Sequence, residues 1–333
     1  MTQVSSSPAP SHIAFILTPG YSLMSVASAV EPLRAANLLA ERPLYQYRFL
    51  SEAGGFMAST ATGGFNTEPW WQEEHSFDLV FIAAGGNPMV YENTDLRRYL
   101  RHLRKQGVPL GGISGGSAIL ARFGMMDGRR FTVHWQHVQA LRDLFPHLLV
   151  ERSLYVIDRD RYTCAGGVAA LDMMHAMIAA EHGTSFARTV SDWFIHTDIR
   201  TSSDPQQSSV EQQYGVTHPA LVAAIGLMNT HLADPLSAEQ LGMLSGQSAR
   251  QLQRLFNAQL GEPMMQFYRN LRLDKANELL QQVALPITQI ALATGFGNAA
   301  HFSRCFVARF GMTPAQRRAQ GIQSHTVRSL RVR

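Results

Sequence analysis

A polar segment at residues 201–213 separates two regions of the chain that have different hydrophobic patterns. Its sequence, TSSDPQQSSVEQQ, contains a single apolar residue and is rich in Ser, Gln, Asp and Pro. Such a composition buries too little apolar surface to fold by itself. We therefore place a linker at residues 201–215. Two domains are expected, because 333 residues also exceed what one hydrophobic core usually supports.

Before the linker, short apolar runs alternate with longer stretches of helical character. The runs predicted as buried strands are residues 12–18, 78–84, 109–114 and 161–165, and the predicted helices after them are 22–40, 94–106, 117–123 and 168–181. This order predicts an α/β domain over residues 12–200, with a doubly wound, mostly parallel, flavodoxin-like sheet covered by helices on both faces. Residues 1–11 are expected to form a disordered tail.

After the linker, every periodic segment is helical and the strand pattern disappears. The predicted helices are residues 219–231, 238–245, 249–259, 263–282, 287–294 and 299–310. In the long helix, Met264, Phe267, Tyr268 and Leu271 fall at offsets of three, four and seven, which places them on one apolar stripe. The sequence therefore predicts an all-α domain over residues 216–320, followed by a basic tail at 321–333.

Two segments of this domain share the pattern of a helix-turn-helix unit. Each has a helix start, a turn glycine and a residue that caps the second helix: Ser237 with Gln240, Gly246 and Ser248 in the first, and Pro286, Gly295 and Asn298 in the second. From residue 215 onward the chain also carries twelve Lys and Arg residues against five Asp and Glu. This charge is expected of a region that meets a polyanion, although a solvated cationic face has the same composition.

The second helix of each unit has one apolar face and one polar face. The polar residues expected to read DNA are Arg250, Gln251, Gln253 and Arg254 in the first unit and Asn298, Ala299, His301 and Arg304 in the second. Arg309, Arg317 and Arg318 are expected to contact phosphates. A helical bundle with a solvated polar face is the alternative, and two such units in tandem favour DNA binding.

A resemblance to a known family supports this interpretation. Residues 286–318, PITQIALATGFGNAAHFSRCFVARFGMTPAQRR, resemble the signature of the AraC/XylS regulator domain, and the similarity extends over residues 218–318. The resemblance implies that two recognition helices enter successive major grooves on one face of double-stranded DNA, about one helical turn apart.

The first domain contains the motif G-I-S-G-G at residues 112–116, between a predicted strand and a predicted helix. G-x-S-x-G in that context is the nucleophile elbow of α/β-hydrolases, so a serine hydrolase or amidase that uses Ser114 is an alternative function. The possible catalytic partners are His134, His175 and His182 as base and Asp158 and Asp172 as acid. His134 precedes both acids, whereas hydrolases place the acid first, and the other two histidines lie on a predicted helix.

Residues 12–196 also resemble the PfpI-like, class I glutamine-amidotransferase-like fold. Enzymes of that fold have a cysteine where this chain has Ser114, and family proteases place a histidine where it has Gly115. The carboxylate of some relatives aligns near Ser25. The resemblance therefore implies a catalytically inactive domain that binds a ligand without reacting.

Joined to an AraC-type domain, this domain has the architecture of the GlxA-like regulators. The stretches EPLRAAN at 31–37, DGRR at 127–130, VHW at 133–135 and IDRDRYT at 157–163 are most similar to the branch that senses arginine, glycine betaine or carnitine. The resemblance implies an effector that is a quaternary amine or an amino acid. It also implies a homodimer and an activator, which would contact RNA polymerase.

Ligands of doubly wound sheets bind beyond the carboxyl ends of the strands. The residues expected to bind the effector there are Tyr21, Gly86, Asn87, Ser114, Gly115, His134 and Trp135. Backbone N–H groups at Gly86 and Gly115 could hold a carboxylate, and Trp135 could face a cationic head. A core aromatic is an equal interpretation of Trp135, and His134 could equally satisfy a buried backbone group.

Other classes of protein are disfavoured by the composition. Two cysteines, Cys164 and Cys305, exclude a disulfide framework and favour the cytoplasm. The histidines show no spacing typical of a metal site, no cofactor is expected, and no apolar run is long enough to cross a membrane. Nothing in the sequence supports a redox role for Cys164, because an electropositive, exposed setting is not evident.

Overall fold

The computed structural model describes residues 9–71, 76–282 and 285–326, and the chain divides into two compact units, Met1–Gln206 and Gln207–Arg333. Of the two tails that we expected, residues 1–8 and 327–333 lie outside the described residues. The first strand already begins at Ser11, and the last helix continues to Thr326.

The first unit contains an eight-stranded sheet in the order β3-β4-β2-β1-β5-β6-β10-β9. Its strands are β1 (Ser11–Leu17), β2 (Tyr45–Ser51), β3 (Gly55–Ala58), β4 (Gly64–Pro69), β5 (Leu79–Ala84), β6 (Leu110–Ser114), β9 (Tyr155–Asp158) and β10 (Arg161–Cys164). The strands from β4 to β10 are parallel, and β3 and β9 pair antiparallel at the edges. The run β2-β1-β5-β6-β10 is the flavodoxin-like order, so the predicted doubly wound sheet is confirmed.

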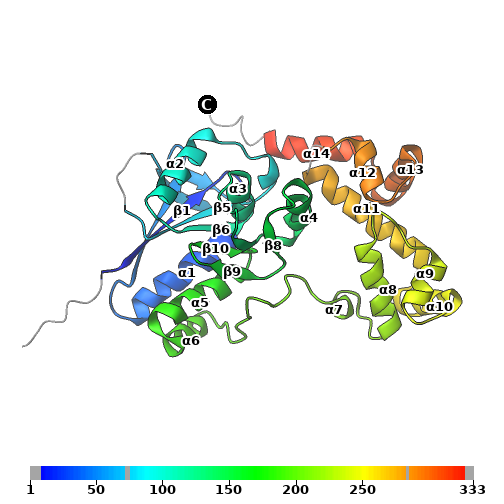
Figure 1. The fold of residues 1–333 in the computed structure, drawn as a ribbon, viewed down its shortest axis with the longest axis horizontal. Helices are drawn as coiled ribbons and strands as arrows, with labels where there is room; N and C mark the ends of the chain where they lie inside the picture. The colour runs from blue at the N-terminus through cyan, green and yellow to red at the C-terminus, as the bar shows by residue number, and fades with distance from the viewer. Residues whose placement is uncertain (1–8, 72–75, 283–284, 327–333) are drawn as a thin grey trace, which may run out of the picture. The chain divides into compact units, whose positions relative to one another are not determined.

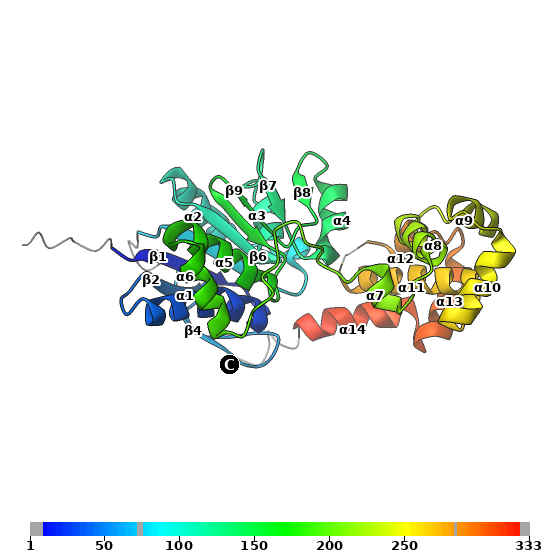
Figure 2. The same ribbon diagram turned by 90° about the horizontal axis from the view of Figure 1, so that it is seen from below.

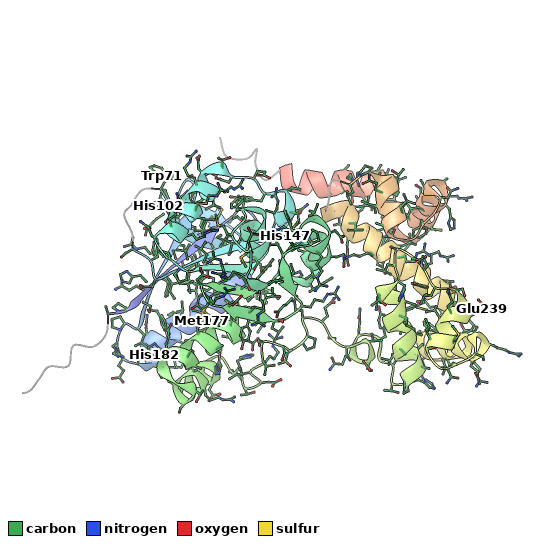
Figure 3. All side chains as sticks on the ribbon, in the orientation of Figure 1. Trp71, His102, His147, Met177, His182 and Glu239 are labelled. Carbon is green, nitrogen blue, oxygen red and sulfur yellow. The ribbon has the colours of Figure 1, made fainter. Side chains whose placement is uncertain are left out.

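Helices cover both faces of this sheet (Figures 1 and 2). One face carries α1 (Leu23–Leu39), α5 (Ala169–His182) and α6 (Thr184–Trp193), and the other carries α2 (Thr94–Lys105), α3 (Gly116–Arg122) and α4 (Trp135–Leu144). Neighbouring strand residues alternate between the two cores: Phe81 joins the α1 side and Ile82 the α3 side. Met177 of α5, labelled in Figure 3, is buried in the core on the α1 side of the sheet.

Two of the sequence stretches that are typical of the GlxA-like group pair with each other. Arg129 forms an ion pair with Asp160 at 2.7 Å, and the Asp158 carboxylate accepts the backbone N–H of Arg130 at 2.8 Å. These contacts hold β7 (Arg130–Thr132), which pairs with β8 (Leu149–Glu151) in a small second sheet, beside the β9-β10 hairpin. The DGRR and DRDR stretches therefore have a structural role here.

The described part of the second unit is helical, as predicted. Its helices are α7 (Val210–Tyr214), α8 (Pro219–Thr230), α9 (Ala238–Leu244), α10 (Ala249–Leu260), α11 (Met264–Gln282), α12 (Ile287–Ala293), α13 (Ala299–Phe310) and α14 (Pro314–Thr326). The linker expected at residues 201–215 contains α7, because a Ser209–Gln212 capping box starts this helix and Val210 and Tyr214 pack against the core of the second unit.

One helix joins the two halves of the second unit (Figure 1). The first half of α11 contributes Met264, Phe267 and Tyr268 to the core formed with α8, α9 and α10. Its second half contributes Leu273 and Ala276 to the core formed with α12 and α13. The predicted apolar stripe of α11 therefore packs into the first core, and residues that follow it along the helix pack into the second.

Candidate DNA interface and candidate effector site

The first helix-turn-helix unit consists of α9 and α10. The Ser237 hydroxyl accepts the backbone N–H of Gln240 at 3.2 Å, and the Gln240 side chain accepts the N–H of Ser237 at 2.8 Å. Ser248 and Gln251 make the same reciprocal pair at the start of α10. Gly246 has a φ of +74°, which lets the chain turn between the helices. The predicted capping boxes and turn of this unit are thus present.

The second unit, α12 and α13, has the same plan with different capping chemistry. The Asn298 side chain accepts the N–H groups of Ala300 and His301 at 2.8 and 3.2 Å. Gly295 has a φ of +75°, and a Cβ there would lie 2.6 Å from the carbonyl oxygen of Leu232. Only glycine fits this turn, because both the backbone conformation and the close approach exclude a side chain.

Two polar residues of α11, Tyr268 and Arg272, form hydrogen bonds to both helix-turn-helix units. The sequence pattern did not predict this role. The Tyr268 hydroxyl donates to the carbonyl of His231 and accepts the N–H of Leu236. Arg272 donates to the carbonyls of Thr294 and Gly295 at 2.8 and 2.6 Å. These bonds tie α11 to the start of one unit and to the turn of the other. The sequence feature that could have predicted this role is the position of Arg272, a charged residue next to the apolar stripe of a helix that packs in the core.

Several residues predicted to read DNA are exposed, and three of them are arginines without an ion-pair partner among the described residues. Arg250 and Arg254 on α10 and Arg304 on α13 form no ion pair within the described residues. Ala299 and His301 are exposed in the first turn of α13, and Nε2 of His301 lies 3.3 Å from the Cys305 Sγ. These side chains project from the second helix of each unit, which is the helix that enters the major groove in proteins of this type.

Other residues predicted to contact DNA form hydrogen bonds or ion pairs within the protein. The Gln253 side chain accepts the N–H of Met264 at 3.3 Å and donates to Asn257 at 3.0 Å. Arg309 forms a two-pronged ion pair with Asp274 at 2.8 and 2.6 Å. Both residues therefore join α11 to the second helix of a unit, and a role in DNA contact would be additional to that.

The remaining predicted contacts are also held. Arg317 donates to the Asn277 side chain at 2.8 Å, and Arg318 donates to the carbonyl of Leu285. Gln251 belongs to the capping box of α10, and Asn298 caps α13. These four residues stabilise the helix ends and α14, and a role in DNA contact would be additional to that.

The elbow in the first unit adopts the backbone conformation of a nucleophile elbow. Ser114 ends β6 with a φ of +58°, which is rare for a residue other than glycine. A Cβ on Gly166 would lie 2.5 Å from the Ser114 Cβ, so the loop after β10 lies directly against the elbow. The Ser114 side chain is half-buried, and its hydroxyl has no hydrogen bond within the described residues.

None of the proposed catalytic partners is hydrogen-bonded to Ser114. Three of them bind elsewhere: His175 to Ser191 at 2.8 Å, Asp172 to Arg200 and His196, and Asp158 to Arg159. The ring of His182 packs against Tyr45 and Phe186, and its Nε2 has no hydrogen-bond partner within the described residues. Nδ1 of His134 accepts the N–H of Gln136 at 3.4 Å. Ser25 lies near the elbow, since its hydroxyl accepts the N–H of Gly167 at 2.7 Å. A hydroxyl without a base in reach is a weak nucleophile.

Two of the residues expected to bind the effector are occupied in the fold. The N–H of Gly115 donates to the carbonyl of Ala84 at 3.0 Å, so it is not available to a carboxylate. Tyr21 is fully buried, and its hydroxyl donates to the carbonyl of Met57 at 3.2 Å. Tyr21 is therefore a core aromatic in this structure. Burial also raises its pKa.

The other expected effector residues lie at loop positions. Gly86 is exposed with a φ of +60°, and the half-buried Asn87 accepts the N–H of Met89 at 3.1 Å at the start of a short 3-10 helix. His134 and Trp135 are half-buried at the start of α4, with ring centroids 5.3 Å apart. Burial lowers the pKa of His134, which favours the neutral ring.

The linker meets this region of the first unit. Nε2 of Gln206 donates to the carbonyls of Val133 and Ser153 at 3.1 and 2.7 Å and to the hydroxyl of Thr132 at 3.0 Å. Val133 directly precedes His134 and Trp135. The last residue of the first unit is therefore anchored to the segment that carries two expected effector contacts.

Cys164 lies fully buried at the end of β10, and burial raises its pKa to about 12. A thiol in that setting is inert. Among residues 9–71, 76–282 and 285–326, no group of three or more His, Cys, Asp and Glu is placed to hold a metal ion. The same residues contain no helix whose length and apolar character would let it span a membrane.

Comparisons with known proteins agree with the two parts of the fold. Residues 243–320 match a helix-turn-helix domain, and residues 65–180 match the DJ-1/PfpI family. An AraC family transcriptional regulator from Pseudomonas putida is similar in structure, with 25% identity and a TM-score of 0.50 over 56% of this chain and 100% of that chain. A ThiJ/PfpI family protein from Pseudomonas syringae, 19% identical, shares the fold with a TM-score of 0.50, covering 72% of this chain and 91% of that chain.

Two relatives are similar over nearly the whole chain. The HTH-type transcriptional regulator GlxA from Rhizobium meliloti is 45% identical over 307 residues, which are 92% of this chain and 95% of the relative. The HTH-type transcriptional regulator CdhR from Pseudomonas aeruginosa is 41% identical over 305 residues, 92% of this chain and 90% of the relative. The chain therefore belongs to the GlxA-like family of transcriptional regulators, in which a DJ-1/PfpI domain precedes an AraC-type helix-turn-helix domain.

Proposed function

We propose that the second unit reads operator DNA with Arg250 and Arg254 of α10 and with Ala299, His301 and Arg304 of α13. The observation that carries this proposal is the pair of capped second helices, on which the exposed Arg250, Arg254 and Arg304 form no ion pair within the described residues. Arginine pairs with O6 and N7 of guanine through two hydrogen bonds, and the small Ala299 leaves room for a thymine methyl group.

The experiment begins with full-length protein and a pool of random-sequence duplexes, from which bound sites are selected and sequenced. We expect two half-sites about one helical turn, or about 10 base pairs, apart. Arg254→Ala should weaken binding to the selected site by about 1–3 kcal/mol and relax the preference at one position. Arg101→Ala is the matched control, since Arg101 is an exposed arginine on α2 of the other unit. Parental affinity and preference in Arg254→Ala would contradict this role for α10.

We also infer that the first unit binds a small nitrogenous metabolite, such as a quaternary amine or an amino acid, and does not catalyse a reaction. Support comes from the elbow: within the described residues the Ser114 hydroxyl forms no hydrogen bond, and His134, His175, Asp158 and Asp172 each bond to other groups. The half-buried Trp135 presents an aromatic ring that suits a cationic head group.

A thermal-shift screen with amines and amino acids tests the effector, because a ligand stabilises the state that binds it. A serine-directed phosphonate probe tests the enzymatic alternative. We expect no labelling, and stoichiometric labelling of Ser114 would reinstate a hydrolase. For the whole protein we propose a homodimer that acts in the cytoplasm and activates transcription with RNA polymerase as partner. Transcription in vitro with and without the stabilising ligand tests that direction of control.

A further inference from the structure

A groove with a volume of about 600 Å³ lies between α11 and α13 of the second unit. Arg269, Gln266 and Asn270 line it from α11, and Arg304 and Arg309 line it from α13. No acidic residue is part of the lining. The sequence pattern does not single out Arg269, because it lies on the helix whose apolar residues pack into the cores of both helix-turn-helix units.

The positive charge of this groove is only partly compensated. The Asp274 carboxylate, outside the lining, neutralises Arg309 through its two-pronged ion pair. A second acid, Glu262, accepts a hydrogen bond from Asn270 at 3.0 Å. Arg269 and Arg304 are exposed and form no ion pair within the described residues. Two guanidinium groups therefore line one groove without a counter-ion, and a groove lined by one sign of charge attracts anions.

The position of the groove indicates which anion. Arg304 belongs to the face of α13 that we propose to read DNA, so the groove opens toward the duplex on that side. When two recognition helices occupy successive major grooves on one face, the minor groove between them faces the protein, and its two edges are sugar-phosphate backbones. In the structure, α11 runs from the α10 half to the α13 half of the unit (Figures 1 and 2).

We propose that this groove seats a DNA phosphodiester between the two major grooves and that Arg269 is its principal contact. The proposal rests on the function proposed above. Gln266 and Asn270 supply amide N–H donors beside the guanidinium group, and such donors bind phosphate oxygens without reading sequence. Arg269 accordingly adds affinity and sets the position of the duplex, whereas the recognition helices select the sequence.

Salt titrations of DNA binding test this contact. Full-length protein is titrated with a fluorescent duplex of arbitrary sequence at several salt concentrations, and affinity is followed by anisotropy. Each lost phosphate contact should reduce the slope of log affinity against log salt by about 0.9, so that raising the salt from about 50 to 200 mM weakens binding of the variant about threefold less than binding of the parent. We expect this change in Arg269→Ala. Gln266→Glu, which puts a carboxylate in the groove, should weaken binding further, and Arg101→Ala should leave the slope unchanged.

The controls separate a lost contact from a damaged fold or a wrong function. Arg269 has no internal partner to lose, so Arg269→Ala should melt like the parent, and Arg269→Lys should retain most of the slope. A parental slope in Arg269→Ala together with weakened specific binding in Arg254→Ala would overturn the groove and leave the proposed function standing. Parental binding in both variants would reject the proposed function instead. Stabilisation by inorganic phosphate that requires Arg269, with an unchanged DNA slope, would make the groove a small-anion site.

Discussion

A buried carboxylate, Asp172 of α5, anchors the segment that leads to the linker. Its side chain has no solvent exposure. One oxygen accepts the backbone N–H of Arg200 at 3.1 Å and lies 3.0 Å from Nε2 of His196, and the other accepts the Arg200 guanidinium at 3.1 and 2.6 Å. Substitution by alanine would remove all of these bonds at once.

The expected loss of stability follows from the burial of the pair. Removal of one partner from a buried ion pair costs about 3–5 kcal/mol, because the other charge is left uncompensated. The Arg200 side chain is 35% exposed, so water can partly solvate it after the change. We therefore expect Asp172→Ala to lower the free energy of unfolding of the first unit by about 3 kcal/mol, at the lower end of that range.

The chain offers a direct assay for the first unit. All four tryptophans, Trp70, Trp71, Trp135 and Trp193, belong to it, so tryptophan fluorescence reports its unfolding alone. With a urea dependence of about 3 kcal/mol per M, a loss of about 3 kcal/mol moves the midpoint by about 1 M.

Asp198→Ala removes an exposed carboxylate nearby and should change stability by no more than about 0.5 kcal/mol. Asp172→Asn keeps the size of the side chain but not its charge, and it should show most of the loss. If the midpoint of Asp172→Ala matched that of Asp198→Ala, the ion pair would contribute nothing and our reasoning would be refuted. Binding of either variant to DNA without urea should equal that of the parent, because Asp172 lies in the other unit.

The remaining predictions concern the elbow, the ligand, the linker and the cysteines. Ser114→Leu should abolish ligand-induced thermal stabilisation but preserve DNA binding, and a retained thermal shift would move the site elsewhere. Trp135→Ala should weaken a cationic ligand more than a neutral one of similar size, measured by calorimetry. Gln206→Ala removes the bond to the Val133 carbonyl, whereas the Ser153 carbonyl keeps the Thr132 hydroxyl, and it should destabilise the first unit by about 1–3 kcal/mol in the same urea assay. Because burial raises the pKa of Cys164 to about 12, its folded thiol keeps a proton that the unfolded chain releases above about pH 8.5. Its contribution to stability is complete below that pH and falls as pH rises toward 12. At pH 8 an alkylating reagent should label Cys305 first, and equal labelling of Cys164 in the folded protein would contradict this.

Local patterns were sufficient to predict most of the second unit. Capping residues, turn glycines and apolar spacing act over a few residues, so Ser237, Ser248, Asn298 and Gly295 have the predicted roles in the structure. The α/β class of the first unit was predictable for the same reason, since buried parallel strands such as β5 are continuous apolar runs. Strands with mixed patterns, such as β2, β3 and β4, and the short helix α7 were not predicted.

Which polar side chains are free was decided only by tertiary structure. Arg254 and Arg309 both occupy second helices of the units and are alike in sequence terms, yet Asp274 of α11, 35 residues away, holds Arg309 and nothing described holds Arg254. The same applies to Gly115, whose N–H is taken by Ala84 of a neighbouring strand. Capping and periodicity are properties of adjacent residues and can be read from the chain, whereas a partner brought in from a distant segment exists only after folding.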